Sequence, residues 1–102
     1  MPKIDYGHTT FEWDDAKNAS NKLKHKVSFE AALTVFFDQN HLTQTDFVKD
    51  AEQRWRTIGM AENTLILFIG HLVYDDDGTE VIRIITARKA TAHERKEYYG
   101  NH

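Results

Sequence analysis

The stretch TLILFIGHLVYDDDGTEVIRIITARKA, residues 64–90, decides the fold. A continuous apolar run covers residues 64–69, and a second covers residues 81–86. Such runs are typical of central strands that are covered on both faces. Between them, Asp77-Gly78 at the end of an acidic triplet is the Asp-Gly signal of a tight hairpin turn. The stretch therefore predicts two antiparallel strands in the middle of a sheet.

Further strands are predicted outside this hairpin. Residues 42–47 and 54–60 alternate between apolar and polar side chains, and residues 11–13 read as a short strand with an apolar face. Six aromatic residues at core spacings are assigned to the hydrophobic core rather than to base stacking. They are Trp13, Phe29, Phe36, Phe37, Trp55 and Phe68.

Capping signals and apolar periodicity predict three helices. Asp14 can cap a helix over residues 15–25, whose apolar face would carry Ala16, Ala19 and Leu23. Ser28 can cap a second helix, and residues 91–94 have the form of a capping box before a helix that ends near Tyr99. The second helix has the clearest periodicity, which predicts a core face of Phe29, Ala32, Leu33, Phe36 and Phe37.

The predicted order is strand, two helices, three or four antiparallel strands, then a helix. This order is typical of an α+β fold, in which two N-terminal helices and one C-terminal helix accompany an antiparallel sheet of three to five strands. Residues 1–10 are expected to be a flexible lead-in, residues 11–99 a single domain, and residues 100–102 a tail.

Size and composition limit what the chain can do. Its 102 residues and 11.9 kDa allow one domain with a modest core. The absence of cysteine excludes disulfides, thiolate nucleophiles and cysteine-containing metal sites. No segment has the length of a membrane span, and no leader pattern opens the sequence, so a soluble, cytoplasmic protein is expected.

The net charge of −3 gives no argument for nucleic-acid binding, but the distribution of charge does. The stretch 17–26 carries four lysines and no acid, and the stretch 83–96 is also rich in basic residues. Much of the compensating negative charge gathers in residues 75–80. These basic stretches are either ordinary solvated surface or one continuous basic face.

Arginines within predicted strands are harder to explain as solvated surface. Arg83 shares a strand face with Val81 and Ile85, so its guanidinium emerges among apolar neighbours. Arg54 and Arg56 likewise share a face. A guanidinium in such a place needs either a carboxylate partner or a bound anion, because a buried unpaired charge is very costly. For Arg54, the carboxylate of Glu52 has the right parity to form an ion pair.

Motifs for other chemistries are absent. The sequence has no nucleophile elbow, no phosphate-binding glycine loop, and no histidine spacing that predicts a metal site or any other cofactor. Acid–base chemistry on a phosphate remains, and RNA suits it because its 2′-hydroxyl is a built-in nucleophile. His25 could serve as the base, or it could simply stabilise a helix C-terminus.

Six pieces of sequence, in this order, resemble the BrnT toxin family over about residues 11–99. They are Phe11-Glu12-Trp13-Asp14, Lys17 with Asn21, Lys24-His25 with Val27 and Phe29, Glu52-Gln53-Arg54-Trp55 with Ile58-Gly59, residues 83–90, and Glu94-Arg95. The resemblance implies the toxin of a type II toxin-antitoxin pair with a RelE-like ribonuclease fold. It also implies metal-independent RNA cleavage that inhibits translation. The implied partner is a ribbon-helix-helix antitoxin similar to BrnA, which binds promoter DNA and so connects the toxin to DNA only indirectly.

The resemblance also implies a set of site residues. Arg54, Arg83 and Arg88 would hold the phosphate, and Glu52 or His25 would act as general base with Lys24 nearby. Tyr98 and Arg56 are possible additional members. The alternative is a catalytically degenerate toxin whose role is to bind the antitoxin, and a third reading is an α+β adaptor with a basic face.

The sequence departs from the family at Lys26, where the family usually has glycine. Glycine adopts a left-handed backbone freely at a helix C-terminus, whereas lysine does so at a cost of about 1 kcal/mol. The expectation is that either Lys26 is strained or the helix ends differently. Lys26 is also a candidate for an extra phosphate contact.

Overall fold

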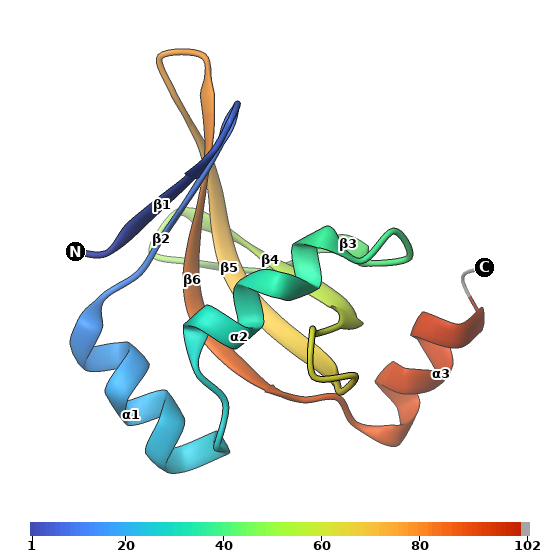
Figure 1. The fold of residues 1–102 in the computed structure, drawn as a ribbon. Coiled ribbons are helices and arrows are strands. Elements are labelled where there is room, and N and C mark those ends of the chain that lie inside the picture. Colours follow the sequence, from blue (N-terminus) through green and yellow to red (C-terminus); the bar gives the residue numbers. More distant parts are fainter. Residues whose placement is uncertain (101–102) are drawn as a thin grey trace.

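The computed structural model describes residues 1–100 and shows one six-stranded sheet with helices on both faces (Figure 1). The predicted tail is Gly100, the last residue of its helix, and two residues that lie outside the described part. The elements in chain order are β1 (Lys3–Tyr6), β2 (Thr9–Glu12), α1 (Asp15–His25), α2 (Phe29–Leu33), the 3₁₀ helix η1 (Thr34–Phe37), β3 (Leu42–Lys49), β4 (Glu52–Met60), β5 (Ile66–Asp76), β6 (Thr79–Lys89) and α3 (Ala92–Gly100). Within residues 1–100, none of the helices has both the length and the apolar character required to cross a membrane.

The strand order is β1-β2-β6-β5-β4-β3. All neighbours are antiparallel except β2 and β6, which are parallel. The α+β class is confirmed, but the sheet is mixed and larger than the predicted antiparallel sheet of three to five strands. As predicted, β5 and β6 form a hairpin at the centre, and its turn contains Asp77 and Gly78 at positive φ.

The first ten residues differ from the expected flexible lead-in. β1 pairs with β2 in a hairpin, and β2 then adds to the edge of β6 through residues 9–12. Strand β1 is short and mostly exposed, so it lacks the apolar alternation that a sequence pattern detects. The hydrogen bonds to β2 and the packing of Tyr6 against Phe37 hold β1 in place.

The predicted caps are confirmed. The Asp14 carboxylate accepts a hydrogen bond from the Lys17 amide at 3.0 Å, and the Ser28 hydroxyl accepts one from the Ala31 amide at 3.0 Å. Before α3, Thr91 and Glu94 form the reciprocal pair of a capping box, with distances of 3.2 and 2.9 Å. Local sequence therefore fixes where each of these helices begins.

The inward face of α1 differs from the prediction, because asparagines occupy it. Asn18 and Asn21 are buried, whereas Leu23 is 77% exposed. Beyond Arg83, β6 has no strand neighbour on the β2 side, and Asn21 takes that place. Its amide donates to the carbonyl of Ala87 at 2.8 Å and accepts the Ala87 amide at 3.2 Å. These two bonds satisfy backbone groups at an otherwise open edge.

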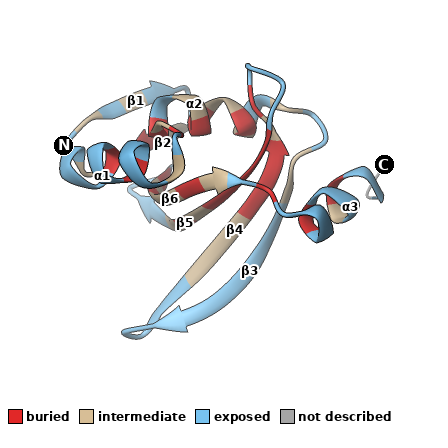
Figure 2. Ribbon diagram, turned by 90° about the horizontal axis from the view of Figure 1, so that it is seen from below, coloured by how far each residue is buried: buried red, intermediate tan, exposed pale blue. Residues whose placement is uncertain are grey.

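The main core lies between the sheet and α1, α2 and η1 (Figure 2). Trp13 and Phe29 are buried there as predicted, while Phe36 and Trp55 are only partly buried. Phe37 is 54% exposed, so its assignment to the core was wrong. The chain tightens into the 3₁₀ helix at residues 34–37, and the three-residue turn rotates Phe37 away from the direction that an α-helix would give it.

The opposite face of the sheet is called the α3 face here, because α3 packs on it. Phe68 is buried on this face in a small cluster with Ile58, Ile66, Ala90 and Tyr98. Side chains alternate between the two faces, so Leu67 and Ile69 on either side of Phe68 enter the main core. Beyond this cluster, towards the exposed end of the sheet, the α3 face carries charged residues.

Lys26 lies in the left-handed region with φ of 61°, directly after α1. We expect Lys26→Gly to raise the free energy of unfolding by about 1 kcal/mol, because glycine adopts this conformation without the steric cost of a Cβ. Urea denaturation monitored by circular dichroism measures the change.

The matched control is Lys26→Ala, which removes the same charge and the Nζ hydrogen bond to the Leu23 carbonyl but keeps the strained backbone. It should give no stabilisation. Equal stabilisation by both variants would instead assign the effect to the lysine charge. If Lys26→Gly binds RNA as well as the wild type, the predicted phosphate contact is excluded.

Candidate active site

Four of the predicted arginines lie on the α3 face. Arg83 is paired with Leu72 and Arg88 with Phe68, so both belong to the face that carries Phe68. Arg56 is paired with Gly70 on the same face, and Arg54 lies two residues before it on β4. Strands that are separate in the sequence thus bring these side chains to one surface.

Gly70 leaves room at the centre of this face. A Cβ at residue 70 would lie 2.8 Å from Cγ2 of Thr86, which is closer than carbon atoms approach. Any larger residue would push Thr86 aside. A glycine at this position therefore lets the side chain of Thr86 pack over the strand on the α3 face.

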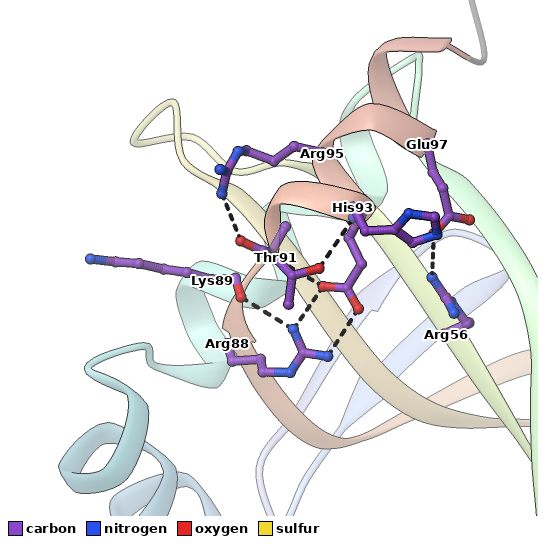
Figure 3. Close-up of polar contacts among 9 residues, drawn as sticks. Arg56, Arg88, Lys89, Thr91, His93, Arg95 and Glu97 are labelled. Carbon is purple, nitrogen blue, oxygen red and sulfur yellow. Dashed lines mark hydrogen bonds and ion pairs between the residues drawn. The ribbon is translucent and has the colours of Figure 1, made fainter.

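Arg88 is held by Glu94, the capping residue of α3 (Figure 3). Its Nη1 and Nη2 donate to the two carboxylate oxygens at 2.7 and 3.0 Å. This bidentate pair lowers the pKa of Glu94 to about 2 and raises that of Arg88. The same carboxylate thus caps the helix and fixes the guanidinium.

Arg56 and Arg88 both pack on Phe68. Their guanidinium carbons lie 5.3 and 4.1 Å from the centre of its ring. Arg56 also donates to Glu97 of α3 at 3.2 Å, and Figure 3 shows the two side chains meeting beside His93. Phe68 is therefore covered by cations and buried, which supports its assignment to packing rather than base stacking.

Arg83 is paired with Glu12, a residue for which the sequence predicted no role in the site. Its Nη1 donates to Glu12 Oε2 at 2.9 Å, and the hydroxyl of Tyr74 donates to the same oxygen at 2.5 Å. Burial of Glu12 acts to raise its pKa, but these two donors outweigh it, so the pKa lies below its usual value. The parallel pairing of β2 with β6 creates this contact, and no local pattern around Glu12 indicates it.

Arg54 and Glu52 form the predicted ion pair, but a loose one. Their closest N–O distance is 3.7 Å, and the Glu52 side chain is 54% exposed. The Glu52 carboxylate is therefore accessible and is not locked beneath the sheet. The buried Nε atoms of Arg54 and Arg56 have no hydrogen-bond partner within residues 1–100.

The two hairpins of the sheet separate near Glu52. Pairing between β4 and β5 stops at Trp55 and His71, although β4 begins at Glu52 and β5 continues to Asp76. Figure 1 shows the β5–β6 hairpin extending beyond β3 and β4, with the β1–β2 hairpin beside it. A cavity of about 270 Å³, called the fork here, lies between the strands and is lined by Glu52, Gln53, Trp55, Leu72, Val73 and Tyr74.

The remaining predicted residues lie on helices rather than on the strands of the sheet. Lys24 and His25 lie in the last turn of α1, and no hydrogen bond or ion pair connects them to the sheet arginines within the described chain. Tyr98 is buried, and its hydroxyl donates to Asp38 at 2.6 Å. Burial and this bond raise its pKa to about 12. The structure therefore groups the strand residues on the α3 face and places Tyr98 in the apolar cluster around Phe68 on that same face, whereas Lys24 and His25 belong to α1.

A second cavity is on the other face. It measures about 400 Å³, lies between the sheet and η1, and none of the predicted site residues lines it. Its walls are largely aromatic, including Phe11, Phe36 and Phe37. Within residues 1–100, no cluster of three or more histidine, aspartate or glutamate side chains is placed to hold a metal ion. The predicted arginines of the site all lie on the α3 face instead.

The fold and this face define a small α+β domain with an arginine-lined sheet surface. The model of the family described as the ribonuclease toxin BrnT of type II toxin-antitoxin systems matches residues 13–94. The chain belongs to this family of ribonuclease toxins, and the type II class implies an antitoxin partner.

A solved structure gives the same fold. The crystal structure of the Brucella abortus ribonuclease toxin BrnT is similar, with a TM-score of 0.50 and 22% sequence identity. The match covers 79% of this chain and 95% of that one. No curated protein sequence matches significantly. The family thus rests on the sequence model, and the solved structure supports the fold.

We expect Glu94→Gln to lower the free energy of unfolding by about 2 kcal/mol at pH 7, because it replaces a bidentate charged partner of Arg88. The folded-state pKa of Glu94 is about 2, below its ordinary value of 4.5. The charge therefore stabilises the fold fully above pH 4.5, and this stabilisation is lost as the pH falls towards 2. Urea denaturation at pH 7 and pH 3 measures both effects.

The control is Glu97→Gln, which removes a more exposed carboxylate from the same helix. Its effect at pH 7 should be smaller. A difference between wild type and Glu94→Gln that is the same at pH 7 and pH 3 would contradict the role given to the charge.

Proposed function

We propose that this protein is a metal-independent endoribonuclease with a RelE-like fold that inhibits translation. In this proposal, the 2′-hydroxyl of RNA attacks the adjacent phosphate and leaves a 2′,3′-cyclic phosphate and a 5′-hydroxyl. The observation that carries it is the placement of Arg54, Arg56, Arg83 and Arg88 on the same face of the sheet, with the exposed carboxylate of Glu52 next to Arg54. Membership of a ribonuclease toxin family supports the choice of RNA as substrate.

The proposed roles follow the chemistry of phosphate cleavage. Arg54, Arg83 and Arg88 stabilise the negative charge that develops on the phosphate oxygens. Glu52 is the accessible carboxylate beside them and is suited to accept the proton of the 2′-hydroxyl. His25, with Lys24 nearby, is the second candidate base. The ion pair of Glu52 with Arg54 and the exposure of the Glu52 side chain favour Glu52.

We infer that the antitoxin partner is a ribbon-helix-helix protein similar to BrnA. In this arrangement the antitoxin binds promoter DNA and the toxin reaches DNA only through it. The type II class of the family supports an antitoxin. The cytoplasm, where RNA and the antitoxin are made, is the proposed site of action.

The test uses purified protein and a single-stranded RNA oligonucleotide in the presence of EDTA. Wild-type protein should cleave the RNA, and both Arg83→Ala and Glu52→Ala should lower the rate by about 100-fold or more, because each removes a transition-state interaction. Denaturing gel electrophoresis measures the rate, and mass spectrometry of the products detects the cyclic phosphate.

Lys96→Ala is the matched control, since it removes an exposed cation from α3, outside the arginine cluster. It should cleave like wild type. Equal cleavage by all four proteins would indicate a contaminating nuclease and contradict the proposal. Absence of cleavage by the wild type, together with tight antitoxin binding, would favour the catalytically degenerate toxin instead.

A further inference from the structure

Glu12 is a buried carboxylate at which three strands meet. It belongs to β2, and only 6% of the residue is exposed. Its Oε2 accepts a hydrogen bond from Nη1 of Arg83 on β6 at 2.9 Å and another from the hydroxyl of Tyr74 on β5 at 2.5 Å. One carboxylate oxygen of β2 therefore holds a guanidinium and a phenol from the two central strands.

Glu12 stays charged in spite of its burial. Burial acts to raise its pKa, but the hydrogen bonds from Tyr74 and Arg83 and the charges of Arg83 and Lys3 outweigh that effect, so the pKa lies below its ordinary value of 4.5. A hydrogen bond between two ionised groups is shorter and stronger than one between neutral groups. Arg83 is therefore held by a charged partner at neutral pH.

Stability alone does not account for this pair. Taking two charges out of water costs about as much as their attraction returns, so a buried ion pair is weak evidence of a gain in stability. A long arginine side chain also has many rotamers, and a fixed partner removes most of them before a ligand binds. The contact with Glu12 thus supplies a defined direction for the guanidinium of Arg83.

Arg83 uses only one nitrogen of its guanidinium in this contact. Within residues 1–100, its side-chain hydrogen bonds all come from Nη1, one to Glu12 and one to the sulfur of Met1. Nε and Nη2 lie side by side on another edge of the planar group, and the side chain is 24% exposed. Two parallel N–H groups on such an edge match two oxygens of a phosphate.

The other arginines of the α3 face are paired differently. Arg54, Arg56 and Arg88 each direct Nη2 towards a carboxylate, at 3.7, 3.2 and 3.0 Å. The Nε atoms of Arg54 and Arg56 are also buried. Among these four arginines, Arg83 is the one whose Nε and Nη2 are both left unused by protein groups of residues 1–100.

We propose that Glu12 is a positioning residue of the ribonuclease reaction and fixes Arg83 at Nη1, so that Nε and Nη2 face the scissile phosphate. The inference rests on the proposed ribonuclease function and deepens it by giving the phosphate contact of Arg83 a defined edge. Glu12 itself touches neither the RNA nor the reacting atoms. Tyr74 assists because its hydroxyl donates to the same oxygen and keeps the carboxylate oriented.

The first measurement compares Glu12→Gln with wild type in RNA cleavage in the presence of EDTA. The change keeps the size of the side chain and removes the charge that holds Arg83. The rate at saturating RNA should fall about 10-fold, because a loosely held guanidinium loses part of its catalytic effect, while KM should stay within about threefold.

Glu80→Gln is the matched control. Glu80 is an exposed carboxylate at the same pairing of β2 with β6, where it lies opposite Thr9 and lines the cavity on the other face of the sheet. The same chemical change at this position should leave the rate of RNA cleavage unchanged.

The second measurement separates positioning from a general structural role. Glu12→Gln is combined with Arg83→Ala, which lacks the guanidinium and is expected to be about 100-fold slower than wild type. Positioning predicts that the double variant stays within about twofold of Arg83→Ala, because no guanidinium remains to be fixed. A purely structural role for Glu12 predicts independent losses that multiply to about 1000-fold.

Arg83→Lys tests the free edge with Glu12 intact, so it decides the question even where Glu12→Gln does not fold. Lysine keeps the charge but has no planar edge, and its ammonium is attracted to Glu12. The rate should therefore fall by about 10-fold or more. A rate close to that of wild type would overturn the proposed use of the Nε and Nη2 edge.

Thermal unfolding of each variant shows whether the fold is intact. A wild-type rate in Glu12→Gln, or the same loss from Glu12→Gln with and without Arg83, would overturn the assignment of Glu12 while leaving the ribonuclease function in place. Absence of RNA cleavage by the wild type would overturn both proposals.

Discussion

The antiparallel ladder between β5 and β6 is the constraint on which the rest of the structure depends. Side chains along these strands alternate between the two faces, so one set enters the main core and the other set lies on the α3 face. Ile69 with Ala87 and Ile84 with His71 fill the first face, whereas Phe68 with Arg88 belongs to the second. A shift of one residue in this register would bury arginines and expose the core, so the register fixes both stability and site.

The arginines of the α3 face are stabilised by carboxylates from other elements. Glu12 comes from β2, Glu94 and Glu97 come from α3, and Glu52 comes from β4 itself. Such pairs satisfy charges that would otherwise be costly to bury and fix the guanidinium groups in place before a ligand arrives. They differ in tightness: the bidentate bond of Arg88 to Glu94 is the closest, and the contact of Arg54 with Glu52 is the loosest. The loosest pair, Arg54 with Glu52, lies at the fork, where the proposed chemistry takes place.

The helices serve this sheet in different ways. α2 and η1 cover the core face with apolar side chains, whereas α1 closes the edge of β6 through the amide of Asn21. α3 attaches to the other face through Tyr98 and through the pairing of its first turn with Arg88. The arginine-lined surface is therefore bounded by α3 at one end and by the diverging hairpins at the other.

Local sequence determined the elements whose signals lie within a few residues of one another. The caps at Asp14 and Ser28, the capping box at Thr91 and the Asp-Gly turn were confirmed because each depends on side chain and backbone groups within one turn of chain. The shared face of Arg54 and Arg56 follows from strand alternation alone, and the pairing of Arg54 with Glu52 was predicted from parity.

Only the tertiary structure decided the contacts between distant segments. The β1–β2 hairpin depends on the edge of β6, which no pattern in the first ten residues indicates. Glu12 contacts Arg83 and Tyr74 because β2 pairs with β6 in parallel. Leu23 is exposed because Asn21 takes the inward position on α1 and bonds the backbone of β6. Sequence fixes local conformation through neighbours, whereas the site forms from side chains that meet only when the strands pair.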